Sequence, residues 1–189
     1  SAPRITWTLY ASDGRPEAYE HFDPPFILQA DKVLEKIRNE RYRYFNSEAT
    51  LFPTLANKYE PEVIRELLHN AIAHQDYRRT GKINVLEYED RIVFINEGSF
   101  IPGSIEKAIE PGYRPPYYRN RLLSDAMAKI SMIDQNAIGI RNVYEIQKGR
   151  MLPLPTYDLL DSNRVSVTIY GKVLNRSEEH TSELQSLAY

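Results

Sequence analysis

Cysteine is absent from this 189-residue sequence. Its absence excludes disulfide scaffolds, zinc ribbons, thiol catalysis and haem attachment through a CxxCH motif. Long apolar runs are also missing. None approaches the ~18 residues that a membrane span needs, and no charged-then-apolar start resembles a signal peptide. We therefore expect a soluble, cytoplasmic protein without a membrane partner.

An excess of one sign of charge is lacking as well. The formal net charge is −2, and residues 176–189 alone supply one arginine and three glutamates. Without them acidic and basic residues balance, so the composition indicates no global attraction to nucleic acid. This last segment, RSEEHTSELQSLAY, has no helical or strand period and looks like a translated sequencing adapter, so we expect an artefactual, unstructured tail. Because the chain starts at Ser1 rather than Met, we also expect a fragment of a longer protein.

Several well-known nucleotide-binding and hydrolase motifs are missing. There is no GxGxxG, GxSxG or HExxH, which leaves Rossmann enzymes, serine hydrolases and zincin proteases without support. The nearest approach to a P-loop, Gly98–Ser104, lacks the lysine that would meet the phosphates. A motor helicase is therefore not expected.

Helical and extended patterns alternate along the chain, whose length suits one domain. Apolar spacing predicts helices over 30–39, 62–74, 104–109, 120–130 and 139–147. Alternation predicts strands over 5–9, 82–88, 91–96 and 164–170, with a tight Glu89-Asp90 turn between the middle two. A Pro-bounded loop is expected after the first strand and another over 46–60. Because the hairpin is antiparallel, the expected fold class is α/β: a two-layer sandwich, with helices on one face of a mixed β-sheet.

The strongest local signal lies in the segment Arg65–His74. Glu66, Asn70 and Ala73 recur at i, i+4 and i+7, so they share one face of the helix with His74. The amide oxygen of Asn70 is a hard ligand for Mg²⁺, and Glu66 can orient or deprotonate a water. The small Ala73 lets a ligand approach closely. The same residues also suit the wet face of an ordinary amphipathic helix, and this pattern alone leaves both interpretations open.

Four ordered motifs give the chain a wider resemblance. Glu-x-x-x-Asn-Ala on a helix looks like the N-box of the GHKL, or Bergerat, ATP-binding fold. Residues 62–170 more specifically resemble the RecG-like C-terminal ATP-binding family. The matching motifs are RELLHNAIAHQDY at 65–77, NEG at 96–98, RN at 119–120 and AIGI at 137–140. The resemblance implies a GHKL-like ATP-binding domain over 61–175, preceded by a linker or N-terminal extension over 1–60.

The resemblance implies a role for each matching residue. Asn70 would hold the Mg²⁺ that bridges the triphosphate of ATP, and Glu66 would be the catalytic base. Asn96 would accept from the adenine amino group through its amide oxygen, and Gly98 would let the backbone pass close to the base. The remaining nucleotide-binding positions are Ala73, Gly139 and Ile140.

The last of the four motifs departs from the family. Gly139 would open a helix whose N–H groups face phosphate. The lid motif before it usually has two glycines, whereas here Ala137 takes the first place and a bulky Ile138 follows. An alanine where φ must be positive would strain the loop. Glu97 also adds a negative charge near the nucleotide. These departures argue more strongly against ATP hydrolysis than against the expected fold.

The function implied by the resemblance is Mg-ATP binding by a regulatory domain, with ATP hydrolysis left open. In this family the preceding part often resembles a Schlafen/AlbA-like DNA-binding domain. A transcription regulator that contacts DNA through flanking domains, in a monomer or a homodimer, is the expected context. The alternative is a GHKL-shaped scaffold that mediates DNA or protein contacts without nucleotide.

Two segments mix tyrosine with arginine, at 112–121 and 38–44. Such a composition can stack bases and meet phosphates. Because the body is neutral, we favour a loop or nucleotide lid for the first and a solvated helix end for the second. We expect His69 to be packed or exposed without a metal, and His74 and Asp76 to cap or order the helix end rather than to take part in chemistry.

Overall fold

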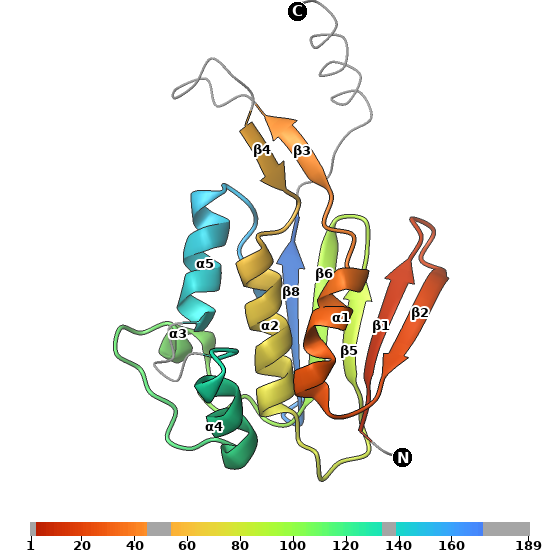
Figure 1. Ribbon diagram of the computed structural model, residues 1–189. Helices are drawn as coiled ribbons and strands as arrows, with labels where there is room; N and C mark the ends of the chain where they lie inside the picture. The colour runs from red at the N-terminus through yellow and green to blue at the C-terminus, as the bar shows by residue number, and fades with distance from the viewer. Residues whose placement is uncertain (1–2, 45–53, 134–138, 172–189) are drawn as a thin grey trace, which may run out of the picture.

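The centre of the fold is a six-stranded mixed β-sheet (Figure 1). The computed structural model describes residues 3–44, 54–133 and 139–171. The strand order is β2-β1-β5-β6-β8-β7, with β1 and β5 parallel and every other neighbouring pair antiparallel. The strands are β1 (Ile5–Tyr10), β2 (Pro16–Phe22), β5 (Ile83–Glu87), β6 (Arg91–Glu97), β7 (Thr156–Asp158) and β8 (Arg164–Tyr170).

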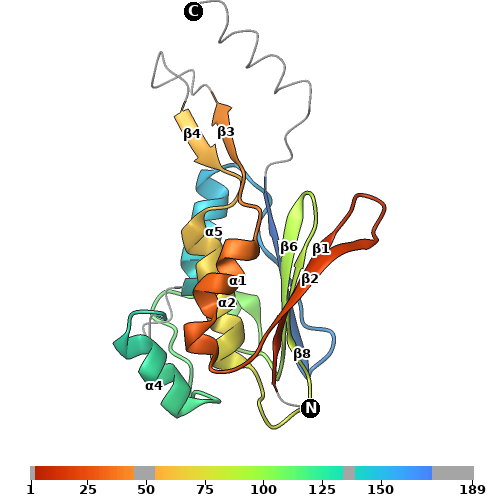
Figure 2. The ribbon, with the colours of Figure 1, turned by 45° about the vertical axis from the view of Figure 1, so that its right-hand side comes forward.

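The helices of the described residues lie on one face of this sheet, as the turned view shows most clearly (Figure 2). They are η1 (Phe26–Leu28), α1 (Ala30–Lys36), α2 (Pro61–His74), α3 (Ile105–Ala108), α4 (Arg121–Lys129) and α5 (Gly139–Gly149). The central helix α2 contacts β5 and β6 as well as α1, α4 and α5. The two-layer α/β sandwich expected from the sequence is therefore confirmed.

Strand alternation explains why only one face of the sheet is covered. In β5, Ile83 and Val85 are buried, whereas Asn84 between them is only partly buried. Successive side chains of a strand point to opposite faces, so the apolar set faces the helices. From the other layer, α2 supplies Leu68 and Ile72, both fully buried. Each such side chain contributes about 1.5–3 kcal/mol on burial.

A buried carboxylate connects both layers. Glu87 is 2% exposed and accepts hydrogen bonds from Trp7 Nε1 at 2.9 Å and from the backbone N–H of Arg38 at 3.0 Å. These donors come from β1 and from the residue that follows the end of α1 at Ile37. A carboxylate survives burial when its oxygens are bonded in this way. Glu87 therefore fixes α1 against the sheet.

The structure has strands where the sequence predicted none. Residues 16–22 form the edge strand β2 within the expected Pro-bounded loop, and β7 was also missed. Arg41–Tyr44 (β3) pairs with Thr54–Asn57 (β4) in a separate two-stranded sheet. The solvated helix end expected at 38–44 and the continuous loop expected at 46–60 are therefore wrong. These strands are short or bury few side chains, so the apolar alternation that reveals a strand is weak there.

The main sheet spans the boundary expected at residue 60. Ile5–Leu9 of β1 pairs residue by residue with Ile83–Glu87 of β5. The early strands are thus an integral part of the sheet. The expected tail at 176–189 lies outside the described residues.

Candidate functional site

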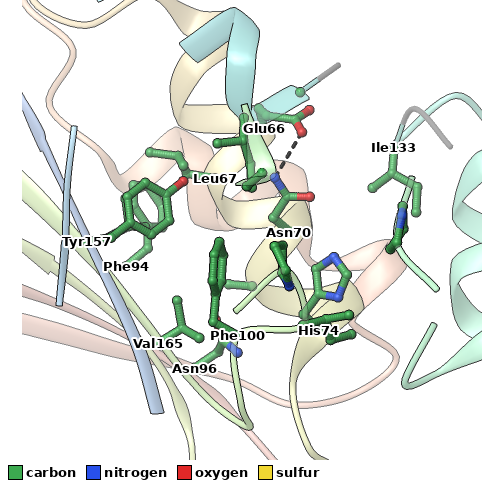
Figure 3. A pocket seen from close by; sticks show the side chains of 18 of the residues that line it. Glu66, Leu67, Asn70, His74, Phe94, Asn96, Phe100, Ile133, Tyr157 and Val165 are labelled. Carbon is green, nitrogen blue, oxygen red and sulfur yellow. Dashed lines mark hydrogen bonds between the residues drawn. The ribbon is translucent and has the colours of Figure 1, made fainter. Parts of the chain in front are cut away.

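A cavity lies between the helix layer and the sheet, and most of the residues implied by the resemblance line it (Figure 3). Helix α2 forms one wall, with Glu66 and Asn70 facing inward. The floor comes from β6, β7 and β8, and the loop from Ser99 to Tyr118 covers the far side. Asn96, Gly139 and Ile140 also line the cavity. Five of the seven predicted site residues are thus brought together, although they are spread over 75 positions of sequence.

The Glu66 and Asn70 side chains are joined across one helical turn. Asn70 Nδ2 donates to Glu66 Oε1 at 2.9 Å. With its nitrogen engaged, the Asn70 amide presents its oxygen on the other side (Figure 3). The i, i+4 spacing therefore positions a carboxylate and an amide oxygen side by side at the cavity wall, as the helical periodicity predicts.

Gly139 meets Glu66 so closely that no side chain fits there. A Cβ built on Gly139 would lie 1.6 Å from Glu66 Oε1 and 2.4 Å from its Cδ. Gly139 is the first residue of α5, so the carboxylate approaches the helix end where N–H groups carry partial positive charge. A side chain at this position would therefore displace the Glu66 carboxylate.

The floor of the cavity is apolar around one amide. Asn96, 7% exposed in β6, donates from Nδ2 to the backbone oxygen of Glu97 at 3.2 Å, which leaves its own oxygen as the acceptor end. Phe94 and Val167 lie on the same face of the sheet, and Tyr157 stands beside them on β7. Burial raises the pKa of Tyr157, so the phenol stays neutral. An apolar slot with a single amide suits a flat heteroaromatic ring.

Two predicted residues do not line the cavity. Ala73 is 1% exposed in the core, and its carbonyl accepts from Asn120 Nδ2 at 3.0 Å. Asn120 Nδ2 also donates to the carbonyl of Gln75 at 2.7 Å, which completes the carboxyl end of α2. Gly98 has φ +115°, and a Cβ there would lie 2.9 Å from the guanidinium carbon of Arg119. The close approach at Gly98 is therefore to a side chain of the protein.

His74 lines the cavity although the sequence assigned it to capping. It lies one turn beyond Asn70 on the helix face that carries Glu66, as the helical spacing predicted. Burial, with a smaller contribution from the Arg119 guanidinium, lowers the pKa of His74 to about 4. The imidazole is therefore neutral near pH 7. The described residues offer neither of its ring nitrogens a hydrogen bond, so it can donate to or accept from a ligand.

The loop over the cavity contributes another polar group that the sequence did not single out. The Tyr113 hydroxyl is buried at the cavity wall and lacks a hydrogen-bond partner among the described residues. A buried hydroxyl without a partner costs free energy, about 1–3 kcal/mol, which a bound ligand can recover. The loop or lid expected at 112–121 is thus in contact with the cavity.

Asp76 and His69 are consistent with ordering roles. Asp76 accepts from the backbone N–H of Arg78 at 3.2 Å and from its guanidinium, and these bonds hold the pKa of Asp76 well below its usual range. His69 is 4% exposed, and its Nδ1 lies 2.6 Å from the carbonyl oxygen of Met132. Burial lowers the pKa of His69, so that bond is made by the neutral ring acting as donor. Ala137 and Ile138 of the lid motif lie outside the described residues.

The cavity volume is about 120 Å³. Pockets that hold drug-sized ligands measure roughly 300–1,000 Å³. A whole nucleotide would therefore exceed this space unless the covering loop moved outward.

Metal and membrane features are limited over the part of the chain that the structure describes. No three histidine or carboxylate side chains gather there as a protein-only metal site. None of its helices combines the length and the apolar character that a bilayer crossing needs.

Comparison with known proteins supports a nucleotide-binding domain. Residues 81–169 match the model of the family described as "Putative ATP-dependent DNA helicase recG C-terminal". This match supports the resemblance to the RecG-like C-terminal family and an ATPase-type domain. The matched region runs from just before β5 to β8 and includes Asn96, Gly139 and Ile140, whereas Glu66 and Asn70 precede it.

Structural comparison supports the fold. The chain is similar to the DIP2311 protein from Corynebacterium diphtheriae, with a TM-score of 0.73 and 16% sequence identity over 88% of this chain. The chain spans 34% of the length of that protein. At this identity the likeness shows the fold alone. Among curated proteins, none matches the chain.

Proposed function

We propose that the cavity binds ATP together with Mg²⁺. The observation that carries this proposal is the convergence of Glu66, Asn70, Asn96 and Gly139 on one apolar cavity, from three separate elements. Polar groups for a metal and for phosphate lie at the α2–α5 end, and an amide surrounded by apolar side chains lies on the sheet. That division matches the two chemical halves of a nucleotide.

The residues present fit a magnesium ion. Mg²⁺ is usually held by one or two protein oxygens, with waters and substrate phosphates completing the shell. The Asn70 amide oxygen is such a ligand, and the negative charge of the neighbouring Glu66 carboxylate favours a cation there. The carboxylate also lies against the start of α5, where it repels an approaching phosphate. A cation between the two charges removes this repulsion, so nucleotide binding should depend on the metal.

The base-binding half is assigned to the sheet. Asn96 accepts from an exocyclic amino group, and the apolar neighbours Phe94 and Val167 exclude water from the ring. His74 and the Tyr113 hydroxyl are the additional polar groups that a ligand would meet. Both are neutral, so neither requires a charged partner on the ligand.

Hydrolysis, where it occurs, falls to Glu66 as the general base that takes a proton from the attacking water. The carboxylate must then be free of the Asn70 bond for part of the cycle, which favours slow turnover. In the proposed setting the domain is a cytoplasmic regulatory part of a DNA-binding transcription regulator. In that setting the flanking domains contact DNA, and the protein forms a homodimer.

Calorimetric titration of the full chain with a non-hydrolysable ATP analogue and Mg²⁺ tests the proposal. Saturable binding is expected, with at least tenfold loss on Asn70→Ala and on omission of the metal. Asn142→Ala is the matched control, because Asn142 is exposed on α5 away from the cavity. If the folded chain gives no heat, the proposal is wrong and the scaffold function replaces it.

The scaffold alternative rests on a specific observation. The cavity is small, and a carboxylate already lies at the helix end that phosphate would need. A protein that had lost nucleotide would keep the fold and contact its partners through the exposed sheet face or loops. In that case the Asn70→Ala variant would behave like the wild type in every interaction assay.

A further inference from the structure

A second, cationic pocket lies beside the nucleotide cavity. It is formed where α2 ends and where the loop before α4 passes over that end. Its lining is Asp76, Arg78, Tyr117, Tyr118, Arg119 and Asn120. Tyr118 lines both pockets, so the two are neighbours. The proposed ATP site does not use the arginines of this pocket.

The lining of this pocket carries more positive than negative charge. Asp76 is 4% exposed, and its two oxygens are engaged by Arg78 at 2.9 Å each. Arg79 lies 3.5 Å and Arg119 3.7 Å from the same carboxylate. Arg79 lies outside the pocket lining, which itself holds two guanidinium groups and one carboxylate, a surplus of one positive charge. A chain that is neutral overall concentrates positive charge here.

The guanidinium groups retain donors for a further anion. Arg78 commits Nε and Nη2 to Asp76, and its side chain is 82% exposed. Arg119 is 12% exposed, donates Nη2 to Ser99, and its buried Nε lacks a hydrogen-bond partner among the described residues. A guanidinium has five N–H donors, so several remain for bidentate contact with phosphate.

An aromatic ring stands beside these donors. Tyr117 lines the pocket with its side chain 55% exposed, in a loop whose other tyrosines are more deeply placed. An exposed aromatic next to arginines is the arrangement that binds single strands, where bases stack on rings and the backbone follows positive charge. A free inorganic phosphate would use the arginines and leave Tyr117 without a role.

We propose that this pocket binds single-stranded nucleic acid, with a phosphodiester on Arg78 and Arg119 and a base stacked on Tyr117. The shared chemistry with a free phosphate is the guanidinium–phosphate contact. Stacking of a base on the Tyr117 ring distinguishes a nucleic-acid strand from free phosphate. This proposal does not rest on nucleotide binding in the neighbouring cavity, because Arg78, Arg119 and Tyr117 have no part in the proposed nucleotide site.

Fluorescence anisotropy with a 5′-labelled oligo-dT and the full chain tests the proposal at low salt. Binding should weaken as salt rises, because phosphate contacts release counterions. Arg78→Gln should weaken it about tenfold. Tyr117→Ala should weaken it about five- to a hundredfold, whereas Tyr117→Phe keeps the stacking face and should bind like the wild type.

Arg114→Gln is the matched control. It removes the same charge from an exposed position of the same loop, outside the pocket lining. Circular dichroism and thermal melting check that each variant is folded. Equal losses from Arg114→Gln and Arg78→Gln would reduce the effect to overall charge and overturn the proposal.

Two further binding measurements identify the ligand. The Asn70→Ala variant should bind the oligonucleotide normally, since it alters only the neighbouring cavity. Inorganic phosphate should compete only at much higher concentration than an unlabelled oligonucleotide. If inorganic phosphate competed as well as the oligonucleotide per phosphate group, and Tyr117→Ala left the affinity for the oligonucleotide unchanged, the pocket would be an anion site and strand binding would be overturned. Absence of oligonucleotide binding by the folded chain would overturn it as well.

Discussion

Gly139→Ala should separate stability from nucleotide binding, because it acts on the Glu66 carboxylate alone. The new methyl group would lie 1.6 Å from Glu66 Oε1 and 2.4 Å from Cδ. Both atoms are at the end of a flexible side chain, so the carboxylate can swing aside while the backbone stays in place. That movement breaks the 2.9 Å hydrogen bond with Asn70.

The expected energies have opposite signs. A partly buried hydrogen bond to a charged group contributes about 1.5–3 kcal/mol, less where water can replace the partner. Replacing glycine by alanine in a helix recovers about 0.4–1 kcal/mol by restricting the unfolded chain. The free energy of unfolding should therefore fall by only about 0.5–2 kcal/mol. Nucleotide affinity, which needs both oxygens aligned, should fall about ten- to hundredfold.

Gly149→Ala is the natural comparison, since it makes the same change at the other end of α5. A Cβ there meets nothing within 4 Å. It should raise the free energy of unfolding by up to about 1 kcal/mol and leave binding unchanged. Urea denaturation gives the first quantity, and calorimetric titration with the ATP analogue gives the second. Wild-type affinity in Gly139→Ala, or a loss of stability above about 3 kcal/mol, would refute the reasoning.

Three further changes test the packing around the site. His74 has a pKa of about 4 in the fold. The neutral ring therefore stabilises the fold above pH ~6.5, and up to about 3 kcal/mol of that free energy of unfolding should be lost as the pH falls to about 4. In His74→Gln, the midpoint of urea unfolding should depend less on pH over that range. Asp76→Asn should lower the free energy of unfolding by about 2–4 kcal/mol, because three guanidinium groups lose their counter-charge. Arg78→Ala, at an exposed side chain, should lower it by under about 1 kcal/mol, and thermal melting measures both. Glu87→Gln should cost about 1–3 kcal/mol and shift the emission of Trp7, whose indole loses a charged acceptor, in fluorescence-monitored unfolding.

The fold could be predicted where burial imposes a period. Helix α2 and strands β5, β6 and β8 each bury one face, so the pattern of apolar residues reports their geometry directly. Strands β2, β3 and β4 could not be found in this way. Few of their own side chains are buried, so pairing of their backbones leaves no apolar alternation in the sequence.

The candidate site could be predicted where it depends on helix spacing. The 66–70 pair follows from the i, i+4 rule, and the structure reports its hydrogen bond at 2.9 Å. Ala73 was assigned from the same spacing, at i+7, and Gly98 from the resemblance, and both face protein groups instead of the cavity. Ala73 points into the core, and Gly98 accommodates Arg119. A motif identifies which positions are constrained, whereas only tertiary packing shows what constrains them.

The pair Arg119-Asn120 makes contacts beside both pockets. Asn120 completes the carboxyl end of α2, whose inner face carries Asn70 and His74. Arg119, the preceding residue, donates to the backbone oxygen of Ser99 beside the first cavity and lines the cationic pocket. Outward movement of the loop to admit a nucleotide therefore pulls on Arg119 and changes the donors offered to a strand. If both sites bind as proposed, occupation of one should alter affinity for the other by the same factor in both directions.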